Sequence, residues 1–351
     1  MKSTALDRRN AKILGRNITE NGILRLIHSA SSAEFVFTGK KLEITVRVNR
    51  EILDYPQNMP RIAILSDERF IVDKAMEKQW EKYTVIDSKE PVTRTIRIIK
   101  LSEAAFSIVE SYPVDTDNDA VIEPVPEKAH KIEFIGDSIT CGYGVDDRNI
   151  LSDFSTDAEN SMKSYAYLTA RSLDADYSLF SYSGYGIISG WTGTGEQNTQ
   201  NVLPKYYLST GLSYCRTGNV MPADIPWDFE SFRADIVVIN LGTNDISFCC
   251  RDEKRYETFE NEYFKFTETV RRCYPEAWII CTAGMMDDSA NGYIENAVKR
   301  FQDDKIRFFS FTKQNDLLGF GSKWHPSEHT HRYAAEELSD FIRKEILNGN
   351  K

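Results

Sequence analysis

Hydrophobic and polar residues alternate along the first third of the chain. Residues 33–48 (AEFVFTGKKLEITVRV) alternate on both sides of a Gly-Lys-Lys sequence, and residues 61–73 (RIAILSDERFIVD) alternate around Ser-Asp-Glu. Two alternating runs joined by a short polar turn are typical of a β-hairpin. Because this region shows no long helical period, the pattern predicts a small β-sandwich over residues 1–112.

From residue 131 the pattern changes to apolar strands that alternate with amphipathic helices. Short apolar runs, each typical of a buried strand, cover residues 131–136, 175–183, 234–242, 277–284 and 305–311. Helical periods are found at residues 164–173, 256–274, 293–302 and 327–347. Alternating strands and helices form βαβ units around a parallel sheet. We therefore expect a three-layer α/β/α domain over residues 131–351.

The segment between these two regions, residues 113–130, is acidic and contains three prolines. This composition predicts a linker, or a strap that lies along a domain surface. The expected organisation is therefore a β-sandwich at residues 1–112, a linker or strap at 113–130 and an α/β/α domain at 131–351.

Composition and charge exclude several classes of function. The chain has 351 residues, of which 41% are hydrophobic, and its formal net charge is −10, which disfavours binding to nucleic acid. No apolar stretch reaches the roughly 18 residues that a membrane-spanning helix needs. The first residues lack the apolar core of a secretory signal, so we expect a cytoplasmic protein. The six cysteines form no Cys-x-x-Cys pair, and we expect them to be reduced core residues.

Conspicuous residues stand where the first three strands of the predicted parallel sheet end. Ser138, Gly184 and Asn244 follow these strands, and His325 directly precedes the last helix. Because the carboxyl ends of parallel strands meet at one edge of a sheet, ligands bind there. We expect four segments to supply a hydroxyl, a backbone amide, a side-chain amide and an imidazole to one site.

These groups suit acyl transfer. A serine hydroxyl attacks a carbonyl when a base takes its proton, and the histidine imidazole suits that task near neutral pH. The backbone N–H groups of Ser138 and Gly184 and the side-chain amide of Asn244 would then form an oxyanion hole. Glycine is expected at position 184 because a side chain would hold the backbone away from the oxyanion. In the simpler alternative Ser138 only caps a helix, but its three partners favour the nucleophile.

Two carboxylates adjoin these candidates. Asp137 directly precedes Ser138, and Asp245 directly follows Asn244. Side chains of this type commonly hydrogen-bond the backbone of their own loop. We expect both to hold the neighbouring site residue in place rather than to act as acids.

Four motifs together resemble a known superfamily. GDSIT (136–140), the turn at Gly184, GTND (242–245) and HPS (325–327) resemble the four blocks of the SGNH hydrolases. With the N-terminal phrases ILGRNI and SAEFVFTGKKLEITV, the chain most resembles carbohydrate esterase family 2. That resemblance implies a jelly-roll-like β-sandwich before the SGNH hydrolase domain. It also implies removal of O-acetyl groups from acetylated plant oligosaccharides of the mannan, glucomannan or xylan type, through an acetyl-enzyme and without a metal or organic cofactor.

The chain departs from the fuller SGNH pattern in one place. Many SGNH enzymes carry an aspartate two or three residues before the histidine, whereas this chain has Lys323 and Ser322 there. We hypothesise a Ser–His dyad in which a backbone carbonyl orients the imidazole, as in some members of the resembled family. Asp287 or Asp288, in the loop after a predicted strand, is the alternative third member.

Other residues invite alternative interpretations. His325, His329 and His331 lie within seven residues and could bind a metal ion. Pro326 is expected as the first helical residue, which places His325 off the helix face, so we expect no metal site and ordinary helical roles for the other two. The glycine cluster GYGIISGWTGTG lacks the spacing of a nucleotide-binding loop. Trp324 is expected to contact the substrate, because it adjoins His325.

Two other functions fit the same sequence. A lysophospholipase or thioesterase would use the same fold and the same serine, but would prefer long acyl chains over acetate. A non-catalytic sugar-binding protein would bind its ligand without hydrolysis. A serine–histidine pair has no purpose in the latter, so the motifs favour an esterase.

Overall fold

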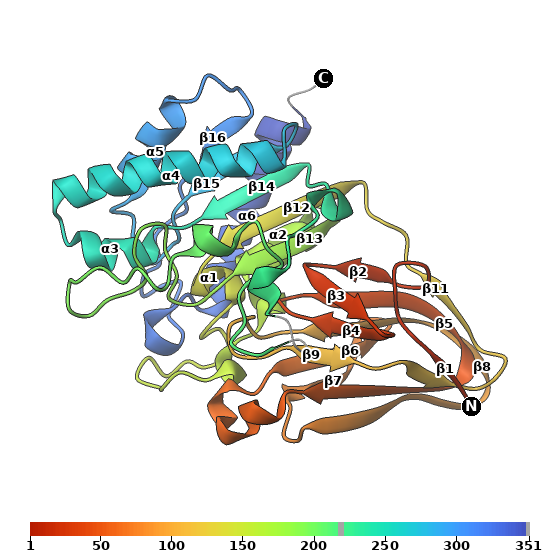
Figure 1. Ribbon diagram of the computed structural model, residues 1–351. Coiled ribbons are helices and arrows are strands. Elements are labelled where there is room, and N and C mark those ends of the chain that lie inside the picture. Colours follow the sequence, from red (N-terminus) through yellow and green to blue (C-terminus); the bar gives the residue numbers. More distant parts are fainter. Residues whose placement is uncertain (217–220, 349–351) are drawn as a thin grey trace. The chain divides into compact units, whose positions relative to one another are not determined.

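The computed structural model describes residues 1–216 and 221–348. The chain forms two compact units, which we call the β-sheet unit and the α/β unit (Figure 1). The β-sheet unit comprises Met1–Glu127, Ser155–Glu159 and Ser209–Pro226, and the α/β unit comprises Lys128–Phe154, Asn160–Leu208 and Trp227–Lys351. One unit is antiparallel and the other has a parallel sheet, which confirms the expected fold class.

One antiparallel sheet links the strands of the β-sheet unit. Its strands are β1 (Lys2–Thr4), β2 (Lys12–Leu14), β3 (Asn17–Glu20), β4 (Ile23–Leu26), β5 (Ser32–Val48), β6 (Arg61–Ser66), β7 (Arg69–Ala75), β8 (Trp80–Lys100), β9 (Val109–Ser111), β10 (Val114–Thr116) and β11 (Val121–Pro124). The order is β3-β4-β9-β5-β8-β6-β7; β2, β10 and β11 also pair with β5, and β1 pairs with β10. The long strands β5 and β8 contribute alternate side chains to one hydrophobic core, because successive side chains of a strand point to opposite faces.

The predicted hairpin at residues 61–73 is confirmed. Strands β6 and β7 pair with Ser66 opposite Arg69, which leaves a two-residue turn between them. Asp67 and Glu68 have φ angles of 48° and 65°. Positive φ at both central residues is typical of the hairpin turns that match strand twist.

The predicted hairpin at residues 33–48 is wrong. Its Gly-Lys-Lys sequence lies inside the continuous strand β5, where the register with β8 shifts between Gly39 and Lys41. The backbone N–H groups of Lys40 and Lys41 donate to Asp117 Oδ1 at 2.8 and 2.9 Å. Buried positions change there from odd to even numbers, as at Phe37 and Leu42. The polar sequence therefore marks a bulge that bends one strand and not a turn between two.

The chain is divided between the units differently from the expectation of a strap at 113–130 and one continuous domain at 131–351. Residues 113–127 belong to the β-sheet unit, because β10 and β11 pair with β5. Residues 155–159 and 209–226 belong to it as well. Long-range hydrogen bonds hold both segments: Thr156 Oγ1 donates to the Met59 carbonyl at 2.5 Å, and His28 Nε2 lies 2.8 Å from the Thr210 carbonyl oxygen.

The α/β unit contains a five-stranded parallel sheet. Its strands are β12 (His130–Gly136), β13 (Ala175–Ser181), β14 (Ile236–Asn240), β15 (Trp278–Thr282) and β16 (Ile306–Phe308), in the order β13-β12-β14-β15-β16. Its helices are α1 (Ser138–Cys141), α2 (Tyr165–Ser172), α3 (Thr243–Cys249), α4 (Glu253–Cys273), α5 (Asn291–Lys299) and α6 (Glu328–Ile342). Each strand and helix predicted for this region is confirmed, and α1 and α3 are short additions at strand ends.

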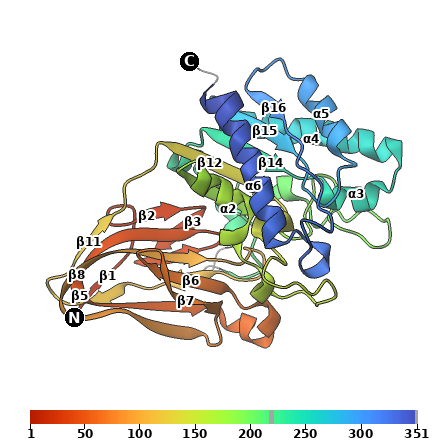
Figure 2. The ribbon, with the colours of Figure 1, turned by 180° about the vertical axis from the view of Figure 1, so that it is seen from behind.

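Helices cover both faces of the parallel sheet. Figures 1 and 2 show α4 and α5 on one face and α2 and α6 on the other. Every residue of β13 and β14 is buried, as expected for a strand with helices on both sides. The apolar faces of the helices therefore pack against the two faces of the sheet. The loops that follow the carboxyl ends of its strands are not covered by these helices.

Short helical turns occur in the connections. The 3₁₀ turns are Arg50–Asp54, Pro56–Asn58, Thr156–Ala158, Ser161–Lys163, Leu203–Tyr206, Pro222–Asp224, Phe229–Phe232 and Ser322–Trp324, and a π-helical turn covers Arg343–Leu347. The turn Ser322–Trp324 ends one residue before His325 and takes part in the site described below.

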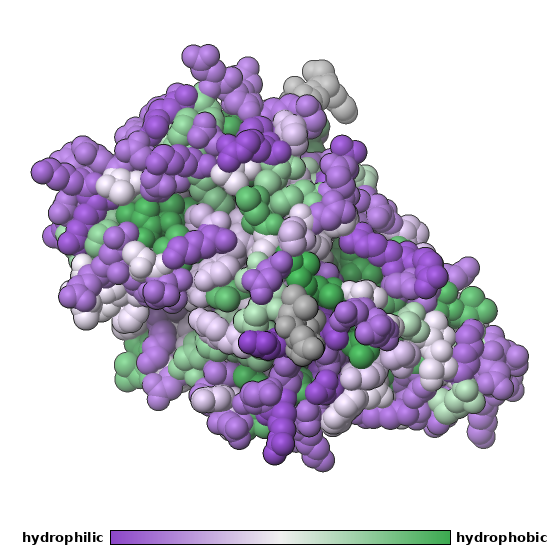
Figure 3. Space-filling view, viewed as in Figure 1, coloured by the Kyte–Doolittle hydropathy of each residue, from purple (hydrophilic) through white to green (hydrophobic). Residues whose placement is uncertain are grey.

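The structure can be compared with what the composition suggested about the surface, membrane-spanning helices and the cysteines. In the view of Figure 3, hydrophilic residues cover most of the visible surface. Within residues 1–216 and 221–348, no helix has the length and apolar character needed to cross a lipid bilayer. All six cysteines are free thiols; Cys141, Cys215, Cys249 and Cys281 are buried, whereas Cys250 is exposed and Cys273 is half-buried.

Candidate active site

Ser138 lies on a tight turn between strand β12 and helix α1. The strand ends at Gly136 and the helix begins at Ser138. A Cβ atom at Gly136 would lie 2.1 Å from Thr140 Oγ1, so only glycine fits. Asp137 caps the helix, since its carboxylate accepts the Ile139 N–H at 3.0 Å. The cap is therefore the aspartate, and the Ser138 hydroxyl is available for another role.

His325 contacts Ser138 across 187 positions of sequence. Its Nε2 atom lies 2.8 Å from Ser138 Oγ, and its Nδ1 atom lies 3.1 Å from the Ser322 carbonyl oxygen. Because a carbonyl oxygen only accepts hydrogen bonds, the proton of the neutral ring belongs on Nδ1. The lone pair on Nε2 then faces the serine hydroxyl, which is the arrangement a general base requires.

An unusual backbone conformation places the Ser322 carbonyl oxygen next to Nδ1 of the imidazole. Lys323 and Trp324 have φ angles of 53° and 63°, in the left-handed region that non-glycine residues seldom adopt. Gly144 packs beneath this loop with φ of 78°. A Cβ atom at Gly144 would lie 2.8 Å from the Ser322 carbonyl oxygen and 3.1 Å from His325 Cβ. A side chain at Gly144 would therefore push the orienting carbonyl away.

Tyr143 supports the histidine from the side. Its ring meets the His325 ring at a centroid distance of 4.6 Å and an interplanar angle of 84°. Its hydroxyl lies 3.4 Å from Ser322 Oγ. The sequence analysis assigned no role to this tyrosine. The signal was the sequence Gly-Tyr-Gly directly after helix α1, which places an aromatic ring between two residues that need positive φ.

The two alternative carboxylates have other partners. Asp287 accepts hydrogen bonds from the N–H and Oγ of Ser289 at 2.8 and 2.5 Å. Asp288 is paired with Lys313 at 2.9 Å. The position of the Ser322 carbonyl next to Nδ1 therefore favours the hypothesis of a dyad oriented by the backbone.

The three candidate oxyanion donors follow neighbouring strands. Gly136 pairs with Ser181 of β13 and with Asn240 of β14, so the three strands end at the same level. Ser138, Gly184 and Asn244 come two to four residues after these paired positions. The topology thus brings the predicted donors to one edge, as the sequence analysis expected.

Asn244 is almost fully buried and firmly held. Its Nδ2 atom lies 3.1 Å from Asp137 Oδ2 and 2.9 Å from the Tyr185 carbonyl oxygen. Both amide hydrogens therefore have protein acceptors. An oxyanion in this site would share one of these hydrogens with the acceptor that holds it in the resting state.

The structure gives a further reason for glycine at position 184, beside the expected access of the oxyanion to its amide, which stays a prediction. A Cβ atom there would meet no protein atom within 4 Å. The φ angle of 80°, however, is one that residues with a side chain adopt at a cost. Backbone conformation therefore favours glycine here without any contact with a protein atom. Its carbonyl accepts the Trp191 N–H at 2.9 Å, which ties the turn to the following loop.

Asp245 holds the loop after Gly184, in addition to the local backbone contact that was expected. Its carboxylate accepts the backbone N–H groups of Ile187, Ile188 and Ser189 at 2.7 to 3.0 Å. A carboxylate surrounded by buried N–H groups fixes a loop well, because each of those donors would otherwise lack a partner. Asp245 therefore connects the start of α3 to the segment that carries the Gly184 amide.

Burial shifts the acid–base properties of the site. It lowers the pKa of His325 to about 4, although the Ser322 carbonyl favours the charged ring. Burial also raises the pKa of Asp137 to about 7, helped by the nearby charge of Asp245. The pKa of Asp245 rises to about 6 by burial, against the effect of its three backbone donors. The imidazole is consequently neutral at pH 7, as a base must be.

Replacing Asp245 with alanine is expected to lower the free energy of unfolding by about 3 kcal/mol, because three buried N–H groups would each lose an acceptor at a cost of about 1 kcal/mol or more. Urea denaturation followed by circular dichroism measures the change. Asp252→Ala is the matched control: this aspartate caps α4 by accepting from Lys254 and Arg255 at the surface. The control should cost about 1 kcal/mol. Equal losses for the two variants would contradict the assigned role of Asp245.

The other histidines of the last segment lie apart from this chemistry. Helix α6 begins at Glu328 with Ser327 as its cap, so Pro326 precedes the helix and is not its first residue as expected. His331 is buried and accepts the Tyr165 N–H on Nδ1 at 3.1 Å, whereas His329 is exposed. In the part of the chain that the structure describes, no three His, Cys, Asp or Glu side chains are grouped so as to hold a metal ion.

Two tryptophans flank the site segments with their rings in solvent. Trp324 is 52% exposed and packs one side against Phe320 at a centroid distance of 5.3 Å. Trp191, in the glycine cluster, is 63% exposed. The indole ring of Trp324 directly before His325 is thus partly exposed, and its contact with a ligand stays a prediction.

Comparison with known proteins gives consistent matches. A model of the GDSL-like Lipase/Acylhydrolase family matches residues 134–333. The chain is 33% identical over 255 residues to the cellulase/esterase CelE of Acetivibrio thermocellus, and this match covers 70% of the chain and 29% of that protein. It is 26% identical over 333 residues to an acetylxylan esterase / glucomannan deacetylase of Cellvibrio japonicus, covering 89% of the chain and 83% of that protein.

A solved structure resembles the whole chain. It is a family two carbohydrate esterase from Clostridium thermocellum in complex with cellohexaose, with a TM-score of 0.81 and 26% sequence identity. The similarity covers 96% of this chain and 99% of that one. The relatives differ in extent, since the chain spans only 29% of the length of CelE. The solved structure shares the fold of this chain over nearly all of its length.

Proposed function

Because the chain belongs to the GDSL-like lipase/acylhydrolase family, we propose that it is a serine esterase that removes O-acetyl groups from plant-derived oligosaccharides of the mannan, glucomannan or xylan type. One observation carries the proposal most directly. Ser138 Oγ lies 2.8 Å from His325 Nε2, while Nδ1 of the same ring faces a backbone carbonyl. With the ring proton on Nδ1, the Nε2 atom can only accept the serine hydroxyl proton, as a general base does.

In the first half of the reaction Ser138 Oγ attacks the carbonyl carbon of the acetyl ester. The hydroxyl proton passes to His325 Nε2, and the carbonyl π electrons move to the oxygen. The N–H groups of Ser138 and Gly184 and the Asn244 amide would stabilise this oxyanion. When the intermediate collapses, the bond to the sugar oxygen breaks. The leaving alkoxide takes the proton from His325, and an acetyl ester of Ser138 remains.

In the second half a water molecule attacks the acetyl-enzyme. His325 takes a proton from the water, and the same donors stabilise a second oxyanion. Collapse breaks the bond between the acetyl carbon and Ser138 Oγ, and His325 returns the proton to the serine. The balance is one ester and one water consumed, with one sugar hydroxyl and one acetic acid formed. No step needs a metal ion or an organic cofactor.

The choice of acetyl esters of saccharides is supported by the relatives. The Cellvibrio japonicus protein is named as an acetylxylan esterase and glucomannan deacetylase, and its match covers most of both chains. The exposed Trp324 ring beside His325 offers a flat face to a sugar, and we include it as a substrate contact.

Acetylated manno- and xylo-oligosaccharides test the proposal. The chain is incubated with each, and loss of acetyl groups is followed by mass spectrometry and NMR, with Ser138→Ala as the control. The expected result is stepwise loss of acetyl with the active chain alone. Preference for octanoate over acetate esters of p-nitrophenol would instead indicate a lysophospholipase or thioesterase. Ligand binding without hydrolysis would indicate a sugar-binding protein.

The pH dependence of kcat/KM is expected to reflect a neutral base with a lowered pKa. The neutral form of His325 is required, and burial lowers its pKa to about 4, so activity should fall only as the pH drops toward 4. An unperturbed imidazole would lose activity near pH 6.5, by contrast. Initial rates of p-nitrophenyl acetate hydrolysis between pH 3.5 and about 8 measure the profile.

Two carboxyl groups near the site have pKa values above that of His325 but within the measured pH range, and they serve as a check. Burial raises the pKa values of Asp137 and Asp245 to about 7 and about 6. A fall in kcat/KM at pH 6 to about 7 that disappears in Asp245→Asn would assign the profile to these carboxyls and contradict its assignment to the imidazole.

A further inference from the structure

Gln314 donates a hydrogen bond to the residue that directly precedes His325. Its Nε2 atom lies 2.7 Å from the Trp324 carbonyl oxygen. Because a carbonyl oxygen only accepts hydrogen bonds, the NH₂ group of the amide faces Trp324. Within residues 1–216 and 221–348 this is the only hydrogen bond of the Gln314 side chain, since its Oε1 atom is buried and has no partner there. The polar contact of this amide is therefore directed to the loop that carries His325.

The peptide group between Trp324 and His325 is held at both ends. Its carbonyl oxygen accepts from Gln314, and its N–H group donates to the Ser322 carbonyl oxygen at 3.1 Å. The same Ser322 oxygen lies 3.1 Å from Nδ1 of the His325 ring. Because a peptide group is planar, rotating its carbonyl away from Gln314 would also turn its N–H group away from Ser322. The glutamine thus stabilises the backbone that orients the imidazole.

The loop needs such a restraint because its backbone is strained. Lys323 and Trp324 have φ angles of 53° and 63°. Residues with a side chain keep a left-handed conformation only where the surrounding structure imposes it. The Lys323 N–H donates to the Ile150 carbonyl oxygen at 3.2 Å, which fixes one side of the turn. Gln314 fixes the other side, because no other donor in the described part of the chain reaches the Trp324 carbonyl.

The main chain of Gln314 is itself anchored. Gln314 lies in the segment after β16, and its N–H group donates to the Met285 carbonyl oxygen at 2.8 Å. Met285 follows the neighbouring strand β15 and is buried. Lys313, the preceding residue, pairs with Asp288 of the same loop at 2.9 Å. Two contacts therefore bind this segment to the loop after β15, and the amide reaches Trp324 from a fixed position.

From these contacts we propose that Gln314 is a positioning residue of the esterase: its amide holds the Trp324–His325 peptide group and, through it, the alignment of the Ser322 carbonyl oxygen with Nδ1 of His325. This role rests on the proposed function, because it serves the same reaction. The task that an aspartate performs in the fuller SGNH pattern is then divided in two. A backbone carbonyl contacts the ring, and a side-chain amide from another loop keeps that carbonyl in place.

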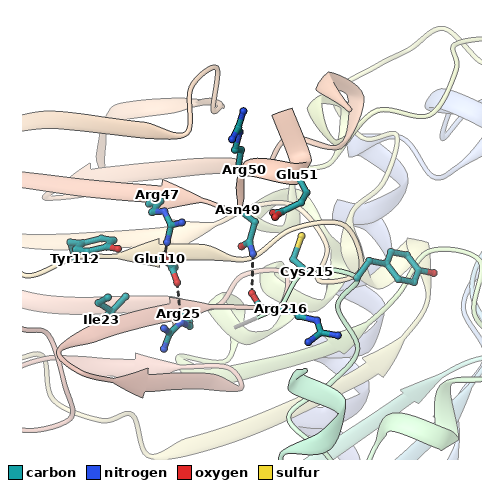
Figure 4. A pocket seen from close by; sticks show the side chains of 11 residues that line it. Ile23, Arg25, Arg47, Asn49, Arg50, Glu51, Glu110, Tyr112, Cys215 and Arg216 are labelled. Carbon is teal, nitrogen blue, oxygen red and sulfur yellow. Dashed lines mark hydrogen bonds and ion pairs between the residues drawn. The ribbon is translucent and has the colours of Figure 1, made fainter. Parts of the chain in front are cut away.

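Gln314→Met tests this role, because methionine has nearly the length of glutamine and lacks its N–H donors. We expect kcat for p-nitrophenyl acetate to fall about 10- to 100-fold with KM unchanged, since a misplacement of reacting groups by about 1 Å can cost about 100-fold. Asn49→Leu is the matched control. Asn49 is half-buried like Gln314, and its side-chain amide donates to the Arg216 carbonyl of the β-sheet unit at 2.9 Å (Figure 4). The control should keep the wild-type kcat, and both variants should lose similar thermal stability, because each loses one hydrogen bond of the same kind.

Gln314→Glu separates the donor from the shape of the side chain. An ionised carboxylate cannot donate to the Trp324 carbonyl, whereas a protonated carboxyl can. The ordinary pKa of glutamate is about 4.3, and a hydrogen bond that only the neutral form makes raises it. The ratio of kcat for Gln314→Glu to that of the wild type should therefore rise as the pH falls from about 8 to about 4.5. The ratio for Gln314→Met should stay constant, because titrations that the variant shares with the wild type, such as those of His325, Asp137 and Asp245, cancel.

Three kinetic results would overturn the proposal. The first is a wild-type kcat for Gln314→Met, and the second is a raised KM with an unchanged kcat, which would assign the glutamine to substrate binding. The third is an equal ratio for Gln314→Glu and Gln314→Met at every pH, which would show that the N–H donor is irrelevant.

A readout besides activity separates this role from the proposed function. Nitrogen NMR of the chain with isotope-labelled histidine reports which ring nitrogen of His325 carries the proton, and His325→Ala assigns the signals. The wild type should keep the proton on Nδ1 at pH 7, and Gln314→Met should lose this preference. Identical spectra of the two would overturn the role of Gln314. The expected difference in a chain without esterase activity would support the restraint on the imidazole and reject the proposed function alone.

Discussion

Replacing Ser138 with alanine is expected to lower kcat for acetyl ester hydrolysis by about a million-fold, and His325→Ala by a similar factor. The two side chains act as one unit through their 2.8 Å hydrogen bond, so the double variant should be no slower than either single variant. Initial rates with p-nitrophenyl acetate measure all three. The residual activity over water would come from the oxyanion donors and from substrate binding.

The same assay decides whether a carboxylate completes the site. In triads the aspartate contributes a factor of about 10,000. Asp287→Ala and Asp288→Ala should have nearly the wild-type rate, because their carboxylates bind Ser289 and Lys313. A fall of several thousandfold in either variant would refute the backbone-oriented dyad. Additive losses in the Ser138 and His325 double variant would refute their joint action.

Replacing Asn244 with alanine is expected to lower kcat by about 100- to 1,000-fold, the usual loss for one oxyanion donor. KM should change little, because the donor acts on charge that develops in the transition state. Steady-state kinetics with acetylated oligosaccharides provide both parameters. Asn296→Ala, a replacement of an exposed asparagine on α5, is the matched control and should leave both unchanged.

A structural effect of Asn244→Ala must be separated from the catalytic one. Asn244 also donates to Asp137 and to the Tyr185 carbonyl, so its loss leaves two buried acceptors without this donor. Thermal unfolding of the variant measures that cost. A variant with a raised KM and an unchanged kcat would show that the amide binds the ground state and does not serve the oxyanion.

The parallel half of the fold could be predicted because its signals are local. Buried strands such as Ile236–Asn240 read as continuous apolar runs, and helices such as Glu253–Cys273 have a clear period and a capping residue. The rule that parallel strands end at one edge then placed Ser138, Gly184 and Asn244 near each other. Their catalytic roles stay predictions, as does the expected cytoplasmic location.

The features that sequence reasoning missed depend on partners far away in the chain. The Gly-Lys-Lys sequence in β5 was read as a turn, because nothing local reveals that Asp117, 76 positions later, accepts the Lys41 N–H. Residues 209–226 join the β-sheet unit through contacts such as that of Thr210 with His28. The larger part of the role of Asp245 was missed for the same reason, since three of its donors lie on the loop of another strand.

The group that orients His325 is part of the main chain. A different side chain at position 322 leaves this oxygen in place as long as the backbone keeps its path, so substitutions that test side-chain chemistry at that position would leave the third participant undetected. Only changes to the path of the polypeptide reach it: a side chain on Gly144, or a β-branched residue in place of Lys323 or Trp324, whose φ angles are positive. The dyad is therefore insensitive to the chemistry of its neighbour and vulnerable to the geometry of one loop.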